Sequence, residues 1–359
     1  MALPLAGIAY AAWHIWVLLP MANLWKWLVI ATGILCFLTL FLDFSRKLDV
    51  MPLPLARVLY GVGTTSFMVL LYLVMTFLLL DLGRLLHLVP RSWLYGNWVT
   101  AAGITGLLLT IFVCGNIHYN NKVRVPINII TKKALPHPYR IVMMSDLHLG
   151  YHNTRSDLKK WVDMVNGEKA DIILIAGDII DISVEPLLSE DMAAEFRRLN
   201  APVYACLGNH EYYSGEPRAE QFYRAAGIHL LSDTFAVVDN AITIIGRDDR
   251  TNARRKSVAQ LASEVRSDSA AAFTIMLDHQ PYHLEQAEEA GIDFQLSGHT
   301  HRGQVWPVSW ITDALYECSW GSHRRGATQY YVSSGIGIWG GKYRIGTQSE
   351  YVVATVKSE

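Results

Sequence analysis

Four apolar stretches dominate the first third of the chain, and each approaches the roughly 20 apolar residues that a helix needs to cross a bilayer core. Tryptophans lie near the proposed ends of these stretches, as they do in interfacial aromatic belts. A buried soluble helix bundle is the alternative, but the charged residues fall between the apolar runs instead of on helical faces. The pattern therefore predicts an α-helical transmembrane region of about four spans. The stretches run from about Leu3 to Pro20, Asn23 to Leu42, Val58 to Leu80 and Trp98 to Gly115.

The distribution of charge separates this region from the rest of the chain. The sequence has 31 basic and 32 acidic residues, of which only nine precede Tyr119. Because charge inside hydrocarbon is costly, this asymmetry indicates a membrane-embedded front and a soluble back. We predict a transmembrane region over residues 1–118, a polar juxtamembrane linker over 119–138 with a short edge strand at Val125–Ile130, and a soluble domain over 139–359.

The distribution of basic residues predicts how the chain is oriented in the membrane. A secretory signal peptide is an alternative for the first apolar stretch, but that stretch lacks a basic segment before it, so we expect a retained span. Four spans place both termini on one side, and the positive-inside rule then favours the cytoplasm for the soluble domain of a multi-pass protein of the cell membrane. Cleavage of the first stretch would reverse this orientation. The basic residues on the domain's side are Arg46, Lys47, Arg57, Lys122, Arg124, Lys132 and Lys133, against Lys26, Arg84 and Arg91.

After Arg140 the pattern changes to short β-rich apolar runs separated by helical patterns, which predicts a layered α/β domain. The expected strands are Ile141–Ser145, Ile172–Ala176, Val203–Leu207, Ile242–Gly246, Phe273–Leu277, Phe294–Ser297, Tyr330–Ser334 and Tyr351–Val356. The expected helices are Ser156–Asn166, Glu190–Leu199, Pro217–Ala226, Ser257–Val265 and Tyr282–Ala290.

Polar side chains that can bind a metal follow five of these strands. Because the carboxyl ends of strands in an open α/β sheet share one crevice, we expect them to converge. Two pairs are spaced i, i+2, which would point both side chains the same way in an extended segment. The residues are Asp146 and His148, Asp178, Asn209 and His210, His279, and His299 and His301.

Imidazole, carboxylate and amide ligands without thiolate suit manganese, iron or zinc better than calcium. The four cysteines are scattered and form no CxxC pair, so they indicate neither a thiolate zinc site nor a disulfide framework. A carboxylate such as Asp178 can bridge two ions about 3.5–4 Å apart, the separation used for displacement at phosphorus. Two divalent ions, two aspartates and one hydroxide sum to a net charge of about +1, which would attract phosphate.

The order of the motifs DxH, GD, GNHE, H and GHTH resembles the calcineurin-like metallophosphoesterases, in particular a membrane-anchored branch, over about Arg140–Val356. The resemblance implies a layered α/β/β/α sandwich and two divalent metal ions, with Mn²⁺ favoured and Fe or Zn as alternatives. It assigns one ion to Asp146, His148, Asp178 and His301, and the other to Asp178, Asn209, His279 and His299. His210 would protonate the leaving group or stabilise the transition state. Arg302 departs from the glycine expected in close relatives, which weakens any transfer of substrate from them.

These features predict a membrane-bound metal-dependent phosphoesterase that hydrolyses a phosphate ester or diphosphate by attack of metal-bound hydroxide. The membrane tether favours a lipid-linked phosphorylated substrate and contact with membrane lipids. The alternatives are a membrane-anchored phosphodiesterase for a soluble nucleotide and a non-catalytic receptor or scaffold. A net charge of -1 gives no support to nucleic acid binding, and 51% hydrophobic residues exclude a disordered chain. The sequence sets no oligomeric state.

Residues around these motifs are given lesser roles. Asp181 is a candidate for supporting a metal ligand, and Glu211 is expected to be a local hydrogen-bond partner. Basic residues stand among aromatic ones near the C-terminus, a combination that fits either a lipid headgroup site or, as we prefer, a solvated face with ordinary packing. The basic members are Arg302, Arg324, Arg325, Lys342 and Arg344.

Overall fold

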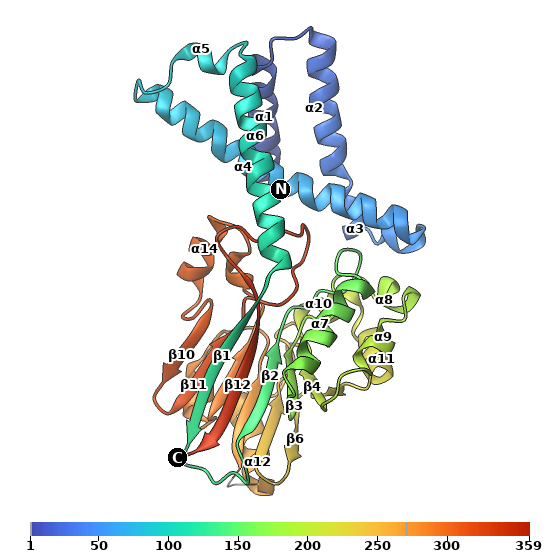
Figure 1. Cartoon of the computed structure of the whole chain (residues 1–359), viewed down its shortest axis with the longest axis vertical. Helices are drawn as coiled ribbons and strands as arrows, with labels where there is room; N and C mark the ends of the chain where they lie inside the picture. The colour runs from blue at the N-terminus through green and yellow to red at the C-terminus, as the bar shows by residue number, and fades with distance from the viewer. Residues whose placement is uncertain (1, 270–271) are drawn as a thin grey trace. The chain divides into compact units, whose positions relative to one another are not determined.

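The computed structural model describes residues 2–269 and 272–359. Its contacts divide the chain into two compact units, one up to Asn116 and one from Ile117 onward. Figure 1 shows the elements of both units.

The first unit consists of helices joined by loops, and its last helix, α6, continues into the second unit. Three stretches are long and apolar enough to cross a membrane: Asn23–Phe44, Leu53–Leu85 and Trp98–Asn120. Large apolar side chains on them are exposed, among them Leu24, Leu79 and Val99, as expected of surfaces that face lipid. The elements are α1 Ala2–Leu18, α2 Asn23–Leu38, α3 Leu40–Phe44, η1 Lys47–Val50, α4 Leu53–Leu85, α5 Arg91–Leu94 and α6 Trp98–Asn120.

Helix α1, the first of the predicted spans, is shorter than a membrane crossing requires. Its 17 residues extend about 26 Å, against roughly 30 Å of hydrocarbon. Polar contacts fix it to α4, since the Tyr10 hydroxyl donates to Asp81 at 2.7 Å and His14 Nε2 lies 3.0 Å from the same carboxylate. The count of about four spans therefore stays a prediction.

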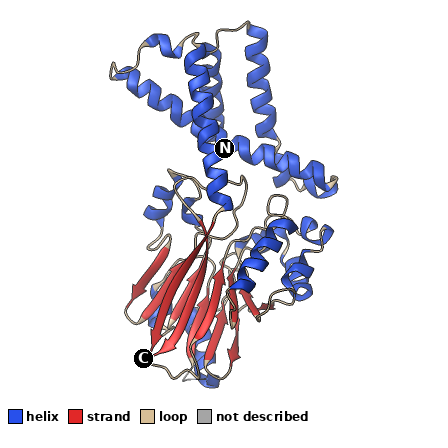
Figure 2. Cartoon of the chain, in the orientation of Figure 1, coloured by secondary structure: helices blue, strands red, loops and turns tan. Residues whose placement is uncertain are grey.

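The second unit contains two six-stranded mixed sheets (Figure 2). In the first sheet the order is β1-β12-β2-β3-β4-β5, and in the second it is β10-β11-β9-β8-β7-β6. The first is built from β1 Lys122–Thr131, β2 Tyr139–Met144, β3 Ile172–Ala176, β4 Val203–Cys206, β5 His229–Leu230 and β12 Ser349–Ser358. The second is built from β6 Thr234–Val238, β7 Ile242–Gly246, β8 Phe273–Leu277, β9 Phe294–Ser297, β10 Gly321–Arg325 and β11 Thr328–Val332.

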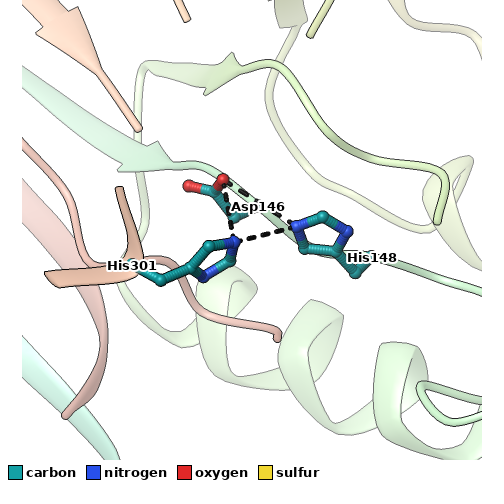
Figure 3. Close-up of side chains that lie close together, drawn as sticks. All are labelled: Asp146, His148 and His301. Atoms are coloured by element: carbon teal, nitrogen blue, oxygen red, sulfur yellow. Dashed lines mark hydrogen bonds and ion pairs between the residues drawn. The ribbon is translucent and has the colours of Figure 1, made fainter. Parts of the chain in front are cut away.

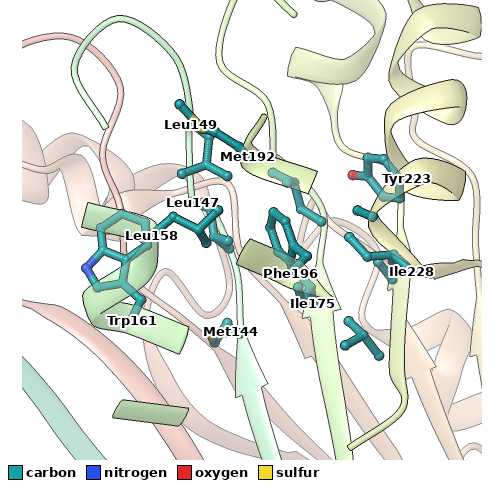
Figure 4. Close-up of a cluster of buried hydrophobic side chains, with 14 of the residues drawn as sticks. Met144, Leu147, Leu149, Leu158, Trp161, Ile175, Met192, Phe196, Tyr223 and Ile228 are labelled. Carbon is teal, nitrogen blue, oxygen red and sulfur yellow. The ribbon is translucent and has the colours of Figure 1, made fainter. Parts of the chain in front are cut away.

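The helices of this unit cover the outer faces of the two sheets. On strand β2, Ile141 and Met143 belong to the core between the sheets, whereas Val142 and Met144 pack against the helices. Figure 4 shows Met144 in this outer core. A third core lies between the second sheet and helices α12 and α13. This period-2 alternation confirms the predicted α/β/β/α layers. The helices are α7 Arg155–Gly167, α8 Glu185–Ser189, α9 Met192–Phe196, α10 Asn209–Ser214, α11 Glu216–Ala226, α12 Val258–Ser269, α13 Glu285–Glu289, η2 His301–Gly303 and α14 Val308–Leu315.

The structure differs from the sequence prediction at the edges of the sheets. The edge strand expected at Val125–Ile130 is present but longer, since β1 has ten residues and pairs in parallel with β12 from Lys122↔Ser349 to Thr131↔Ser358. Pro126 is tolerated there because an edge strand has one unpaired side. Strand β10 was not predicted, because its sequence Gly-Ser-His-Arg-Arg contains no apolar run.

Candidate metal centre

All eight predicted site residues lie just beyond the carboxyl ends of strands. Asp146 and His148 follow β2, Asp178 follows β3, and α10 begins with Asn209 and His210 after β4. On the second sheet His279 follows β8, and His299 and His301 follow β9. The strand ends of both sheets therefore contribute to a single region.

One group consists of Asp146, His148 and His301 (Figure 3). The Nε2 atoms of the two histidines are 3.0 Å apart, and they lie 3.9 and 3.4 Å from Asp146 Oδ1. All three side chains are buried. Two imidazole nitrogens and a carboxylate oxygen that converge at such distances can share one divalent cation.

A second group consists of Asp178, His279 and His299. His279 Nδ1 lies 2.7 Å from the backbone oxygen of Ala176, so Nδ1 carries the proton and donates it. The lone pair of Nε2 then points toward Asp178 Oδ2 at 3.1 Å, and this buried nitrogen has no hydrogen-bond partner among the described residues. Asn209 Oδ1 joins the group 2.8 Å from His299 Nδ1. This donor set also fits a divalent cation.

Asp178 lies between the two groups. Its Oδ2 is 3.1 Å from His279 Nε2 in one group and 3.6 Å from His148 Nε2 in the other. Its Oδ1 accepts a hydrogen bond from the backbone N–H of His210 at 2.9 Å, which fixes the carboxylate. The position suits a carboxylate that bridges two ions.

The backbone at these residues explains how the side chains converge. Asp146, His148, Asp178, His299 and His301 all have positive φ, between 44° and 69°. Non-glycine residues rarely adopt this conformation, and it gathers at functional sites. The expectation that the i, i+2 pairs converge in extended segments is wrong, because β2 ends at Met144 and β9 at Ser297, before the pairs begin.

Two glycines allow the strand ends to approach each other closely. A Cβ at Gly208 would lie 2.1 Å from Asp178 Oδ1, and one at Gly298 would lie 2.3 Å from Asp146 Oδ2. Any larger residue would therefore displace an aspartate of the site.

Asp181 and Glu211 support these side chains, as the sequence suggested. Asp181 Oδ1 lies 3.3 Å from both His148 Nδ1 and His210 Nδ1. The buried Glu211 carboxylate accepts hydrogen bonds from the backbone N–H groups of Gly208, Asp178 and Ile180, at 2.7 to 3.1 Å. It therefore fixes the turns that follow β3 and β4.

Two supporting residues were missed by sequence reasoning. The side-chain amide of the buried Asn153 donates to the backbone oxygens of Leu147, His148 and Ile338, at 2.9 to 3.0 Å. Arg344 is fully buried and donates to the backbone oxygen of His301 at 2.8 Å and to those of Ser334, Gly335 and Gly337. Neither stands in a motif with metal-ligand spacing, so no local signal could have found them.

The position of Arg344 removes it from the basic surface considered near the C-terminus. Its guanidinium is inside the domain, and Arg325 forms ion pairs with Glu288 and Glu317 at 2.9 and 2.7 Å. Arg302 lies over the ring of Trp320 at 4.1 Å. The basic residues of this region are thus engaged mainly within the protein.

The charged groups of the centre shift one another's pKa values. Burial is the largest influence on Asp178 and raises its pKa, but His279, His210 and His148 together outweigh it and hold the pKa well below the usual range. Burial, aided by neighbouring histidines, lowers the pKa of His299 to about 4 and that of His301 well below its ordinary value. Two groups shift the other way: burial raises the pKa of Asp146, and at His279 burial is outweighed by the charges of Asp178 and Asp146, which raise the pKa well above its ordinary value. Because neutral imidazoles and ionised carboxylates are the forms that bind metals, metal binding at these two residues would release protons.

An aromatic and basic rim adjoins the second group. The ring of Tyr316 lies 6.4 Å from that of His299, and its hydroxyl is 2.9 Å from the Tyr282 hydroxyl. The exposed Arg250 lies 3.9 Å above the ring of Tyr282. The adjacent residues Asp248 and Asp249 accept hydrogen bonds from segments that carry site residues. The Tyr212 hydroxyl of α10 donates to Asp248, and the side-chain amide of Gln280 donates to Asp249. Arg250 is therefore available to a ligand at this rim.

Comparison with known proteins agrees with this geometry. The profile of the family described as calcineurin-like phosphoesterase matches residues 139–303. An uncharacterised metallophosphoesterase of Aquifex aeolicus is 31% identical over 247 residues, which cover 66% of this chain and 93% of that protein. One of Helicobacter pylori J99 is 30% identical over 214 residues, 59% of this chain and 58% of that protein.

A zebrafish (Danio rerio) protein named transmembrane protein with metallophosphoesterase domain is 32% identical over 234 residues, which cover 61% of this chain and 53% of that protein. The match with this chain thus spans less than two thirds of the length of the Helicobacter and zebrafish relatives. Together these matches confirm the resemblance indicated by the order of the motifs.

Proposed function

This chain belongs to the calcineurin-like metallophosphoesterases, a family of metal-dependent phosphoesterases, and from this premise we propose its function. The chain would hydrolyse a phosphate ester or diphosphate at the centre formed by the strand ends. The observation that carries the proposal is the convergence of two groups of donors on the two sides of Asp178.

Each side chain has a proposed role. Asp146, His148, Asp178 and His301 would hold one ion, and Asp178, Asn209, His279 and His299 the other. When bound, a pair of divalent cations supplies an activated water and neutralises charge that develops on the phosphoryl oxygens. The nitrogen and oxygen donor set favours Mn²⁺, with Fe or Zn as alternatives.

His210 is the proposed catalytic residue that contacts the substrate. Burial lowers the pKa of His210, but the charges of Asp178 and Asp181 outweigh burial and raise the pKa to about 9. Asp181 Oδ1 lies at an ion-pair distance of 3.3 Å from Nδ1, so its charge would stabilise the protonated ring and leave Nε2 for the substrate. A protonated imidazole there can donate a proton to the leaving oxygen or stabilise charge in the transition state.

Membrane association narrows the substrate class that we propose. Three stretches of the chain can cross a membrane by length and composition, and one relative is named a transmembrane protein. A site tethered near a bilayer favours a lipid-linked phosphate over a soluble one, and the basic residues outside the spans favour the cytoplasmic side.

The test is a hydrolysis screen of the full-length protein in detergent with added Mn²⁺. The substrates would be lipid phosphates, lipid diphosphates, and cyclic and linear nucleotide diesters. We expect activity that EDTA removes, that Mn²⁺ restores and that His210→Ala lowers by about 10² to 10⁴-fold. Turnover of soluble esters alone would refute the lipid-linked substrate, and unaltered activity in His210→Ala would refute the catalytic role.

A further inference from the structure

A cavity of about 260 Å³ lies where helix α6 ends and strand β1 begins, beside helix α7. We call it the juxtamembrane pocket. It is separate from the metal centre and combines two lysines with aromatic rings. Its lining includes Tyr119, Asn120, Lys122, Asp157, Lys160 and Trp161.

The charge available to a ligand in this pocket is positive. Lys122 Nζ donates to the backbone oxygen of Tyr119 at 2.7 Å and lies 3.4 Å above that ring, and no described carboxylate forms an ion pair with it. Asp157 is occupied, because it pairs with Lys342 at 2.8 Å and accepts from the backbone N–H of Thr154. Burial, followed by the charge of Arg344, lowers the pKa of Lys122 well below its usual value. A bound anion would stabilise the charged form of Lys122 and so oppose both effects.

The length of α6 places the pocket at the level of lipid headgroups. Its 23 residues extend about 34 Å, slightly more than the roughly 30 Å of hydrocarbon in a bilayer. If Trp98 begins the span at one interface, Tyr119 and Asn120 end it in the opposite headgroup layer. An aromatic ring beside lysine is typical of this depth.

A chain of hydrogen bonds connects the pocket with the metal centre. The Tyr119 hydroxyl donates to Asn153 Oδ1 at 2.5 Å, and both side chains are buried. The amide of Asn153 donates in turn to the backbone oxygens of Leu147 and His148, at 3.0 and 2.9 Å. Through Asn153, the Tyr119 hydroxyl thus helps to hold the turn that contains the site residues Asp146 and His148.

We propose that the juxtamembrane pocket binds the phosphate headgroup of an anionic phospholipid through Lys122 and Lys160, and that the bound lipid promotes catalysis through Tyr119 and Asn153. The second part rests on the proposed function, whereas the first does not. Tyr119 and Asn153 act here as positioning residues, since neither contacts the substrate.

The binding part is tested by native mass spectrometry of the full-length protein in detergent with phosphatidylglycerol or phosphatidylcholine. We expect preferential retention of phosphatidylglycerol, with affinity lowered about fivefold by either Lys122→Gln or Lys160→Gln. The matched control is Lys159→Gln, because Lys159 is an exposed neighbour on the same helix that does not line the pocket. Equal retention in all three variants, or no preference in the wild type, would overturn the proposal.

Soluble competitors separate a lipid from a free anion. Millimolar inorganic phosphate or glycerol 3-phosphate should leave the bound phosphatidylglycerol in place, and displacement at equal concentration would show a site for free phosphate instead. If Lys122→Gln fails to fold, as judged by thermal unfolding, the exposed Lys160 still provides the test.

The coupling part is tested in vesicles of phosphatidylcholine with and without phosphatidylglycerol, using any soluble phosphoester that the wild type hydrolyses. We expect phosphatidylglycerol to raise the rate about fivefold or more. Tyr119→Phe should retain the lipid but lose this activation, because it keeps the ring and removes the hydrogen bond. Equal activation of both proteins would refute the coupling. A wild type that hydrolyses no phosphoester would instead refute the proposed function, while lipid retention would still be measured.

Discussion

The single methyl group added by Gly298→Ala should disrupt the metal centre without disrupting the fold. The new Cβ would lie 2.3 Å from Asp146 Oδ2 and 2.6 Å from the side chain of Ser145. The φ of Gly298 is not in the left-handed region, so alanine does not strain the backbone there. The Asp146 carboxylate can rotate and must retreat by about 1 Å to restore ordinary contact, whereas the Cβ of Ser145 can yield only through a small shift of its backbone.

A displacement of this size has a large expected effect on catalysis. A misplacement of about 1 Å can lower a rate by about 10²-fold, which corresponds to about 2.7 kcal/mol of transition-state stabilisation. Asp146 belongs to the group with His148 and His301, so the ion held there should be weakened most. We therefore expect the metal content to fall from two ions per chain toward one, together with the loss of rate.

The assay combines metal analysis by mass spectrometry with steady-state rates on the best substrate of the screen. Gly167→Ala is the matched control, because a Cβ at Gly167 meets nothing within 4 Å. Thermal unfolding would establish that both variants are folded. If Gly298→Ala keeps two ions and a rate within about twofold of the control, Asp146 is not the ligand that the geometry indicates.

Three other predictions concern the bridging carboxylate of Asp178, Arg250 at the rim, and the ion pairs that Glu168 forms with the first sheet. Asp178→Ala should lose both ions and nearly all activity, because its carboxylate faces both donor groups; retention of two ions would contradict bridging. Arg250→Gln should raise KM for substrates with a second anionic group more than for simple esters, whereas the exposed Arg254→Gln serves as control and should not. Glu168→Gln should destabilise the domain by about 1 kcal/mol near pH 7, a small value because the paired arginines are partly exposed. Hydrogen bonds from Arg124 lead the effects that lower the pKa of Glu168 from 4.5 to about 2, so this stabilisation exists above pH 4.5 and disappears as the pH falls toward 2. Urea unfolding at pH 7 and at pH 2.5 measures it, and an equal difference between wild type and variant at both pH values would refute it.

The sequence by itself determined the layers and the candidate residues. The continuous apolar run of Ile172–Ala176 is a local property, typical of a strand that is buried on both faces, and the structure reproduces that strand residue for residue. The motifs could be recognised because they follow strands, and the carboxyl ends of parallel strands meet at one edge. Local pattern was therefore enough to indicate which side chains would gather.

Only the tertiary structure decided how those side chains are held. The left-handed turns at Asp146 and Asp178 depend on glycines from other strand ends that leave them room, and Asn153 reaches the oxygen of Ile338 across 185 positions of sequence. Likewise, no local pattern around Arg344 predicts that its guanidinium is buried and donates to the backbone oxygen of His301. Burial makes such polar contacts necessary, because a donor or acceptor removed from water must find a partner, and which remote group provides it is set by packing in three dimensions.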